Sequence, residues 1–256
     1  MCLILFANHV HPDYPLVLIA NRDEFHARPT RIAQWWDSNP NLLAGQDLVA
    51  GGTWLGITKT GCIAAITNYR DPRFHSPQAQ SRGTLTTDFL QQQMSAGAYY
   101  QRLTNQRENF DGYNLIFGSV LELHYYSNRA AGPEKIPSGI YGLSNHLLDT
   151  PWPKVTRGKK MLTAALKHPD LDLDSLWKIL SDSAIAPDSA LPDTGIGLEW
   201  ERLLSAIKIS GDHYGTRASS LLLARQDGRI FFAERTLVSE VGESEATFSF
   251  PIAQEV

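Results

Sequence analysis

Apolar runs separated by short polar turns open the chain. The runs at 2–9 and 16–20 are strand-like, and residues 11–15 between them carry two prolines and an aspartate. This pattern predicts a β-hairpin that begins at the second residue. A second pair of runs, at 54–58 and 62–67, contains small and apolar side chains that are typical of strands buried on both faces.

The hydrophobic period becomes helical after residue 84. Leu85, Phe89, Leu90 and Met94 fall on one helical stripe, and Thr84 is a suitable N-cap. The same reasoning gives the remaining elements. Strands are expected at 113–119, 122–127, 219–225, 229–235 and 246–250, with a short strand ending at 142–145, and helices at 153–167, 173–180 and 198–207, with a loop at 187–197.

The order of these elements is strands, helices, strands, helices and strands. Segregated runs of this kind favour α+β layers over a βαβ alternation. The chain has 256 residues, with no internal repeat and no linker rich enough to divide it. We therefore expect one domain spanning residues 1–256.

Composition limits the classes of partner and compartment. The net charge of −4 gives no global attraction to nucleic acid, and no apolar stretch approaches the ~20 residues of a membrane span. The start of the chain lacks a secretory signal pattern. Only two cysteines are present, and so low a number is typical of a reducing compartment. The chain has no CxxC motif, so the sequence gives no support for a bound metal. A cytoplasmic location is expected.

Cys2 follows the initiator methionine directly. Removal of Met1 would leave Cys2 with both a thiol and a free α-amine, whose ordinary pKa values are about 8.5 and 7.7–8.0. The amine could then accept the thiol proton, so that one residue supplies both nucleophile and base. The alternative is that Cys2 is a small buried hydrophobic residue at the start of a strand.

Four polar residues, Asn21 to Glu24, follow the second apolar run. Such a cluster at the end of a buried strand is costly unless its groups pair. Arg22 near the Cys2 sulfur would favour the thiolate, and Asp23 could orient the α-ammonium group. The alternative is a polar turn with weak surface ion pairs.

The motif Asn21-Arg22-Asp23-Glu24 with Arg28-Pro29 resembles the signature of the NRDE family, also named for the animal transport and Golgi organisation protein 2. Other motifs resemble the same family across nearly the whole chain. They are Gly51 to Gly56, Thr67 to Arg70, Gly142 to Asn145, Pro151 to Val155, and Thr216-Arg217.

A second resemblance concerns the order of possible active-site residues. It is similar to that of choloylglycine hydrolase and penicillin V acylase, which use an N-terminal cysteine on an N-terminal-nucleophile (Ntn) hydrolase scaffold. This resemblance implies a four-layer αββα sandwich with mostly antiparallel sheets. It also implies that Asn68 and Asn145 donate hydrogen bonds to a substrate carbonyl and that Arg217 holds charge around the nucleophile. The residues in that order are Cys2, Arg22, Asp23, Asn68, Asn145 and Arg217.

Members of the NRDE family are linked to intracellular haem trafficking and to the handling of lipids and acyl-CoA. The resemblance thus implies a cytosolic protein that binds and hands over haem, or a similar amphipathic metabolite, to donor or acceptor proteins. Haem would be cargo, and no catalytic cofactor is expected. The candidate haem-binding residues are Cys2, His9 and His146 as axial ligands, Arg22 and Arg70 for the propionates, and Trp54 as a pocket wall.

Two alternatives to haem binding stay open at this point. One is an amidohydrolase that cleaves a linear C–N amide through an acyl-Cys2 intermediate. The other is a protein that binds acyl-CoA or lipid.

Overall fold

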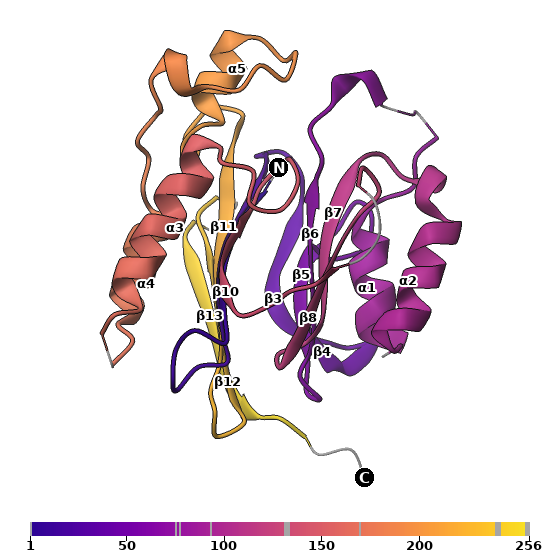
Figure 1. Ribbon diagram of the computed structural model, residues 1–256. Coiled ribbons are helices and arrows are strands. Elements are labelled where there is room, and N and C mark those ends of the chain that lie inside the picture. The colour runs from indigo at the N-terminus through magenta and orange to yellow at the C-terminus, as the bar shows by residue number, and fades with distance from the viewer. Residues whose placement is uncertain are drawn as a thin grey trace.

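Two β-sheets pack face to face in this protein, and helices cover their outer faces (Figure 1). The computed structural model describes residues 2–74, 76, 78–92, 94–130, 134–168, 170–238 and 242–253. Helices α3 and α4 lie on one side of the sandwich and α1 and α2 on the other. The expected α+β, four-layer αββα architecture is confirmed.

The first sheet has six strands and the second has seven, and all neighbouring strands are antiparallel. In spatial order the first sheet contains β10 (Gly139–Leu143), β1 (Cys2–Asn8), β2 (Leu16–Phe25), β11 (Tyr214–Ala224), β12 (Arg229–Thr236) and β13 (Ser244–Pro251). The second contains β3 (Thr30–Trp36), β4 (Asn39–Asp47), β5 (Leu55–Thr58), β6 (Cys62–Asn68), β7 (Tyr113–Ser119), β8 (Glu122–Ser127) and β9 (Glu134–Lys135). The α-helices are α1 (Gly83–Gln92), α2 (Ala96–Asn105), α3 (Pro153–Ala165), α4 (Leu173–Leu180) and α5 (Leu198–Leu203).

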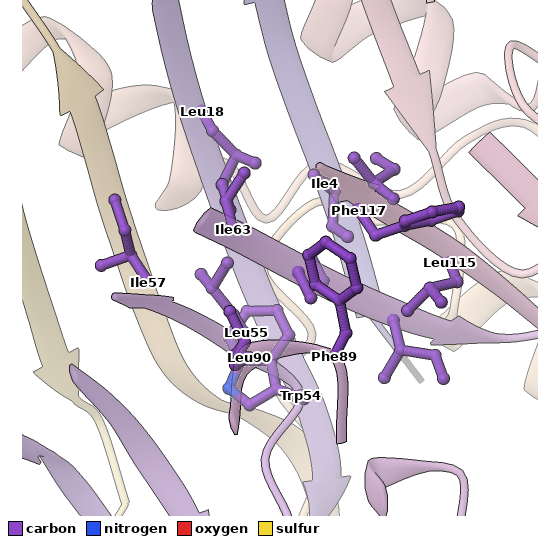
Figure 2. Close-up of a cluster of buried hydrophobic side chains, with 14 of the residues drawn as sticks. Ile4, Leu18, Trp54, Leu55, Ile57, Ile63, Phe89, Leu90, Leu115 and Phe117 are labelled. Atoms are coloured by element: carbon purple, nitrogen blue, oxygen red, sulfur yellow. The ribbon is translucent and has the colours of Figure 1, made fainter. Parts of the chain in front are cut away.

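The burial of strand β1 on both faces explains why its sequence is a continuous apolar run rather than an alternating one. Ile4 and Phe6 belong to the large apolar cluster between the sheets, whereas Leu3 and Leu5 pack with residues of α3 and α4. Both faces of the strand are therefore dry, because a strand sends successive side chains to opposite faces. Figure 2 shows Ile4 from this cluster, together with side chains from β2, β5, β6, β7 and α1.

Several elements differ from the sequence expectation. Strand β2 continues to Phe25 and so contains the polar run that was expected to follow it. Strands β3 and β4 and helix α2 were not predicted, and α5 ends at Leu203. Thr84 lies inside α1 rather than at its N-cap, and its hydroxyl donates to the carbonyl oxygen of Ser81.

No helix in the described ranges is both long enough and apolar enough to cross a bilayer. The longest α-helix, α3, has 13 residues and lies against the first sheet. It begins at Pro153, directly after Pro151-Trp152, so a proline occupies its first turn. Its close approach to β1 depends on Gly158, since a Cβ atom there would lie 2.5 Å from Leu5 Cδ1.

Gly158→Ala should destabilise the fold, because the added methyl group overlaps Leu5 and pushes α3 away from β1. We expect the free energy of unfolding in urea to fall by about 1–3 kcal/mol, as for other overpacked cores. Gly97→Ala is the matched control, since a Cβ atom at Gly97 in α2 meets nothing within 4 Å. That control should gain up to ~1 kcal/mol from helix propensity. Equal effects of the two substitutions would contradict this account of α3 packing.

Candidate functional site

A cavity of about 400 Å³ opens beside the first residue of β1. Its volume lies within the range of about 300–1,000 Å³ that is usual for small-molecule sites. The lining residues come from both sheets, from the start of α1 and from nearby loops. They are Cys2, Arg22, Asp23, Glu24, Arg28, Thr30, Gln46, Asp47, Gly52, Thr53, Trp54, Ile66, Asn68, Ser76, Ala79, Gln80, Ser81, Arg82, Gly83 and Asp111.

Cys2 enters this cavity from the inner face of the first sheet. In the pairing of β1 with β2, Cys2 lies directly opposite Arg22, and residues opposite one another share a face. This is the face of Ile4 and Phe6, which points toward the second sheet. The Cys2 residue is 8% exposed, so the cavity wall holds the sulfur in a largely dry position. Met1 lies outside the described residues.

Arg22 links the two sheets at the cavity. Its guanidinium donates to Thr30 Oγ1 at 3.0 Å and to Asp47 Oδ2 at 3.1 Å. Asp47 also accepts a 2.6 Å hydrogen bond from Arg28 Nε. The carboxylate of Asp47 therefore holds two arginines in the cavity wall.

The pKa of the Cys2 thiol is raised, which differs from the expectation that Arg22 would favour the thiolate. Burial is the main cause, and the negative charge of Asp23 acts in the same direction. Arg22 and the backbone N–H of Asp23 lower the pKa but do not outweigh burial. The thiol therefore needs a nearby base to ionise at neutral pH.

Asp23 sends its carboxylate to the opposite face of β2, toward the layer of α3 and α4. Its Oδ1 accepts a 2.6 Å hydrogen bond from the hydroxyl of Thr216, its paired residue on β11. Tyr214 donates to its backbone oxygen at 3.1 Å. Burial raises the pKa of Asp23, and Lys154 is the largest opposing influence. Asp23 is thus a buried acid whose ionisation depends on neighbouring cations.

Behind Asp23 lie three further buried ionisable groups. Lys154, in the first turn of α3, is 2% exposed. Arg70 and Glu201 form an ion pair of 2.8 Å. Arg70 also stacks over Trp152 at 4.7 Å from the ring centroid. The charges of these groups and of Asp23 sum to zero, which is a condition for burying them together.

Asn68 and Asn145 join the two sheets beside Cys2. The side-chain amide of Asn145 donates to the backbone oxygen of Asn68 at 3.1 Å. The neighbouring Ser144 hydroxyl donates to the backbone oxygen of Cys2 at 3.2 Å. Asn68 lines the cavity, whereas Asn145 is fully buried and is not among the lining residues. The structure therefore brings both asparagines to the level of Cys2 but gives only Asn68 access to a ligand.

Arg217 does not line the cavity. It lies at a bulge, where the pairing of β11 with β2 shifts between Thr216 and Ala218. Its guanidinium donates to the backbone oxygens of Phe25 at 3.2 Å and His26 at 2.8 Å, and also to that of Arg28. Because a bulge turns a side chain away from the regular alternation, Arg217 is directed to the turn after β2.

The candidate haem-binding residues are dispersed. His9 follows β1 at the end away from Cys2, where its Nε2 atom lies 2.9 Å from the oxygen of Leu121. Both ring nitrogens of His146 have partners, Tyr69 and Thr150, each at 2.8 Å. His146 and Arg70 line a second cavity instead.

In the main cavity, the haem candidates are Cys2, Arg22 and Trp54. The arginine is already paired with Asp47. Across the described ranges there is no group of three or more His, Cys, Asp or Glu residues that could hold a metal ion.

Sequence reasoning assigned no role to Lys154, Glu201 or Tyr214. Lys154 was visible only as part of the Pro151 to Val155 motif, and a lysine in an amphipathic helix is normally read as solvated. A usable signal was its position one residue before the inward-facing Val155, next to Trp152 and Pro153. Glu201 was hidden in a short helix with charged residues on several faces.

Comparison with protein families gives a match over residues 1–239, to the family described as Transport and Golgi organisation 2. The Homo sapiens Transport and Golgi organization protein 2 homolog is 36% identical, covering 94% of this chain and 94% of that protein. The Drosophila melanogaster Transport and Golgi organization protein 2 is 28% identical over 93% of this chain and 92% of the relative.

Among solved structures, the chain is similar to the C2A mutant of conjugated bile acid hydrolase from Clostridium perfringens. The TM-score is 0.54 with 9% sequence identity, covering 98% of this chain and 92% of that one. At this identity the likeness concerns the fold alone. It agrees with the expected Ntn-hydrolase-like scaffold.

Asp47→Asn should destabilise the protein, because Arg22 and Arg28 lose their ionised partner. Burial alone would raise the pKa of Asp47, but hydrogen bonds from Arg28 and the N–H groups of Ala50 and Val49 lower it overall. Removing one partner of a largely buried pair costs about 3 kcal/mol of unfolding free energy at neutral pH. The stabilisation is present above the ordinary pKa of about 3.9 and disappears as pH falls through the lower folded value.

Urea denaturation of wild type and variant between pH 7 and pH 3 measures this difference. The gap between the two proteins should narrow below about pH 4. Asp227→Asn is the control, since the Arg225–Asp227 pair is half exposed and solvent screening leaves it little effect on stability. A pH-independent gap for Asp47→Asn would contradict the ionic explanation.

Proposed function

This chain belongs to the Transport and Golgi organisation 2 family, and we propose that it is an N-terminal-cysteine amidohydrolase that cleaves a linear C–N amide. One observation carries the proposal. The thiol of the second residue lines a cavity of small-molecule size, beside Asn68 and next to a buried acid. The mixed charges of the cavity wall suit a small polar amide better than a large apolar ligand.

The proposed reaction begins with removal of Met1, which leaves a free α-amine on Cys2. The amine takes the thiol proton, and the thiolate attacks the amide carbonyl carbon. The resulting oxyanion accepts hydrogen bonds from donors at the cavity wall, for which the Asn68 side chain is the candidate. The leaving nitrogen takes the proton from the α-ammonium group and departs, and an acyl-Cys2 thioester remains.

Water completes the proposed cycle. The α-amine accepts a proton from the attacking water molecule, whose oxygen bonds to the thioester carbon. Collapse of the second oxyanion releases the carboxylic acid and returns the proton to the sulfur. Asp23 holds the amine in place as a positioning residue throughout.

The bile acid hydrolase of similar fold gives limited support. It was solved as a C2A mutant, so that enzyme also has a cysteine at its second position. Its name describes a hydrolase of a conjugate. The cavity of this chain has its own set of charged residues. The proposal therefore specifies the bond that is cleaved, a linear C–N amide, and no particular substrate.

Replacing Cys2 with alanine should abolish the proposed hydrolysis, because the substitution removes the sulfur that bonds to the acyl group. We expect kcat/KM on a panel of small linear amides to fall by about 10³-fold or more. Cys62→Ala is the matched control. Cys62 lies in β6, does not line the cavity and is expected to leave turnover unchanged.

The amine is tested separately by a chain in which one glycine precedes Cys2, with the N-terminus verified by mass spectrometry. The thiol is then intact but the base is an amide, and kcat should fall with little change in KM. Turnover that survives Cys2→Ala would exclude the nucleophile. Full turnover with the blocked amine would exclude the base.

Haem carriage, which the family resemblance implies, stays a prediction with a weaker basis in the site. Cys2 is the axial candidate that lies in the main cavity. If haem is cargo there, titration should give a Soret shift that Cys2→Ala removes and His146→Ala leaves intact. A shift that survives Cys2→Ala, or no shift, would count against haem in this cavity.

A further inference from the structure

Lys154 occupies an unusual position for a lysine. It lies in the first turn of α3 with 2% of its surface exposed, where the helix meets the first sheet. Burial disfavours the ammonium form, and the positive end of the helix dipole disfavours it further. Within the described part of the chain, the Lys154 Nζ atom has no hydrogen-bond partner. A residue held at this cost is a candidate for a functional role rather than a packing role.

The charged groups around Lys154 come from four elements. They are Asp23 on β2, Cys2 on β1, Arg70 after β6 and Glu201 on α5. Glu201 is already engaged by Arg70 at 2.8 Å and by the backbone N–H of Thr194 at 2.9 Å. Among the surrounding charged groups, Asp23 has the largest electrostatic influence on Lys154.

The groups around Asp23 and Cys2 complete this environment. Asp23 faces Lys154, Thr216 and Arg70. Cys2 interacts electrostatically with Asp23 and Arg22. The negative charge of its ionised form also acts to raise the pKa values of Arg82 and Tyr214. In a mature chain the Cys2 α-amine starts β1, beside the strand that carries Asp23.

We propose that Lys154 is a positioning residue that shares the Asp23 carboxylate with the α-amine of Cys2 and thereby keeps that amine neutral, ready to act as a base. The proposal rests on the proposed amidohydrolase function. A lone amine beside a buried carboxylate would hold its proton as an ion pair. A second cation on the same carboxylate weakens that pair and repels the extra proton. The amine is then free to accept the proton of the thiol.

The pKa values of Lys154 and of the Cys2 α-amine agree with a shared Asp23 carboxylate. Burial lowers the pKa of Lys154 to about 8, with Asp23 opposing that shift. An ordinary α-amine titrates at about 7.7–8.0, in the same range. Loss of the Lys154 charge should raise the pKa of the amine and of the thiol, because each loses a nearby positive charge.

The test uses the pH dependence of Cys2 alkylation by iodoacetamide, with Met1 removal verified and the modified site located by mass spectrometry. Lys154→Met should move the midpoint of the rate profile upward by about one pH unit. Lys154→Arg, which keeps the charge, should leave the midpoint near that of wild type. Lys160→Met is the control, since it removes the same charge from an exposed position of α3.

An unchanged midpoint in Lys154→Met would overturn the proposal, and so would equal shifts in the Met and Arg variants. Should Lys154→Met fold poorly, the double variant with Asp23→Asn removes both charges and should recover the lost melting temperature. Failure of that rescue would also count against the pairing. Alkylation needs no substrate, so a chain that hydrolyses nothing can still show the shift. Conversely, hydrolysis with no shift would leave the amidohydrolase standing and remove the role of Lys154.

Discussion

The register of β1 against β2 is the constraint on which the site depends. It sets Cys2 opposite Arg22, and both side chains then face the second sheet. Arg22 continues across the interface to Thr30 and Asp47, so the strand pair is fixed to the opposite sheet at the point where the chain begins. A shift of one residue would place Cys2 opposite Asn21 or Asp23, and the thiol would no longer share a face with Arg22.

The same register separates two environments. On the inner face, the thiol meets a cavity with paired arginines and carboxylates. On the outer face, the Asp23 carboxylate meets the charges of Lys154 and Arg70, although the residue also contributes to the cavity lining. The first residue of the strand lies at the boundary between them. The backbone nitrogen of Cys2 therefore lies between the charges of the outer face and the cavity that its thiol lines.

Sequence patterns predicted the elements in which apolar residues form a continuous run or a single helical stripe. Strands β1, β7 and β11 have such runs because both of their faces are buried, and α1 has such a stripe because one of its faces is buried. Strands β3 and β4 mix exposed and buried positions without regular alternation, so their pattern gave no clear period. The polar end of β2 was assigned outside the strand because Asp23 to Phe25 extend beyond β1 and pair with β11, nearly two hundred residues away.

Within the site, the resemblance identified Cys2, Arg22, Asp23 and Asn68, all of which line the cavity. It could not show which face each side chain takes. His9 lies away from the cavity because it follows the far end of β1. Arg217 lies away from the cavity because the bulge in β11 redirects its side chain. The burial of Lys154 could not be predicted from the sequence, because it results from the tertiary contacts of α3.

The bulge in β11 connects a strand outside the cavity to the shape of the cavity wall. Arg217 gathers the backbone oxygens of the turn after β2, and the last of them belongs to Arg28, whose side chain reaches the cavity wall. The shape of that turn is therefore set by a strand that is itself outside the binding surface. Substitution of Arg217 would therefore change the shape of the cavity wall while every lining residue stays the same.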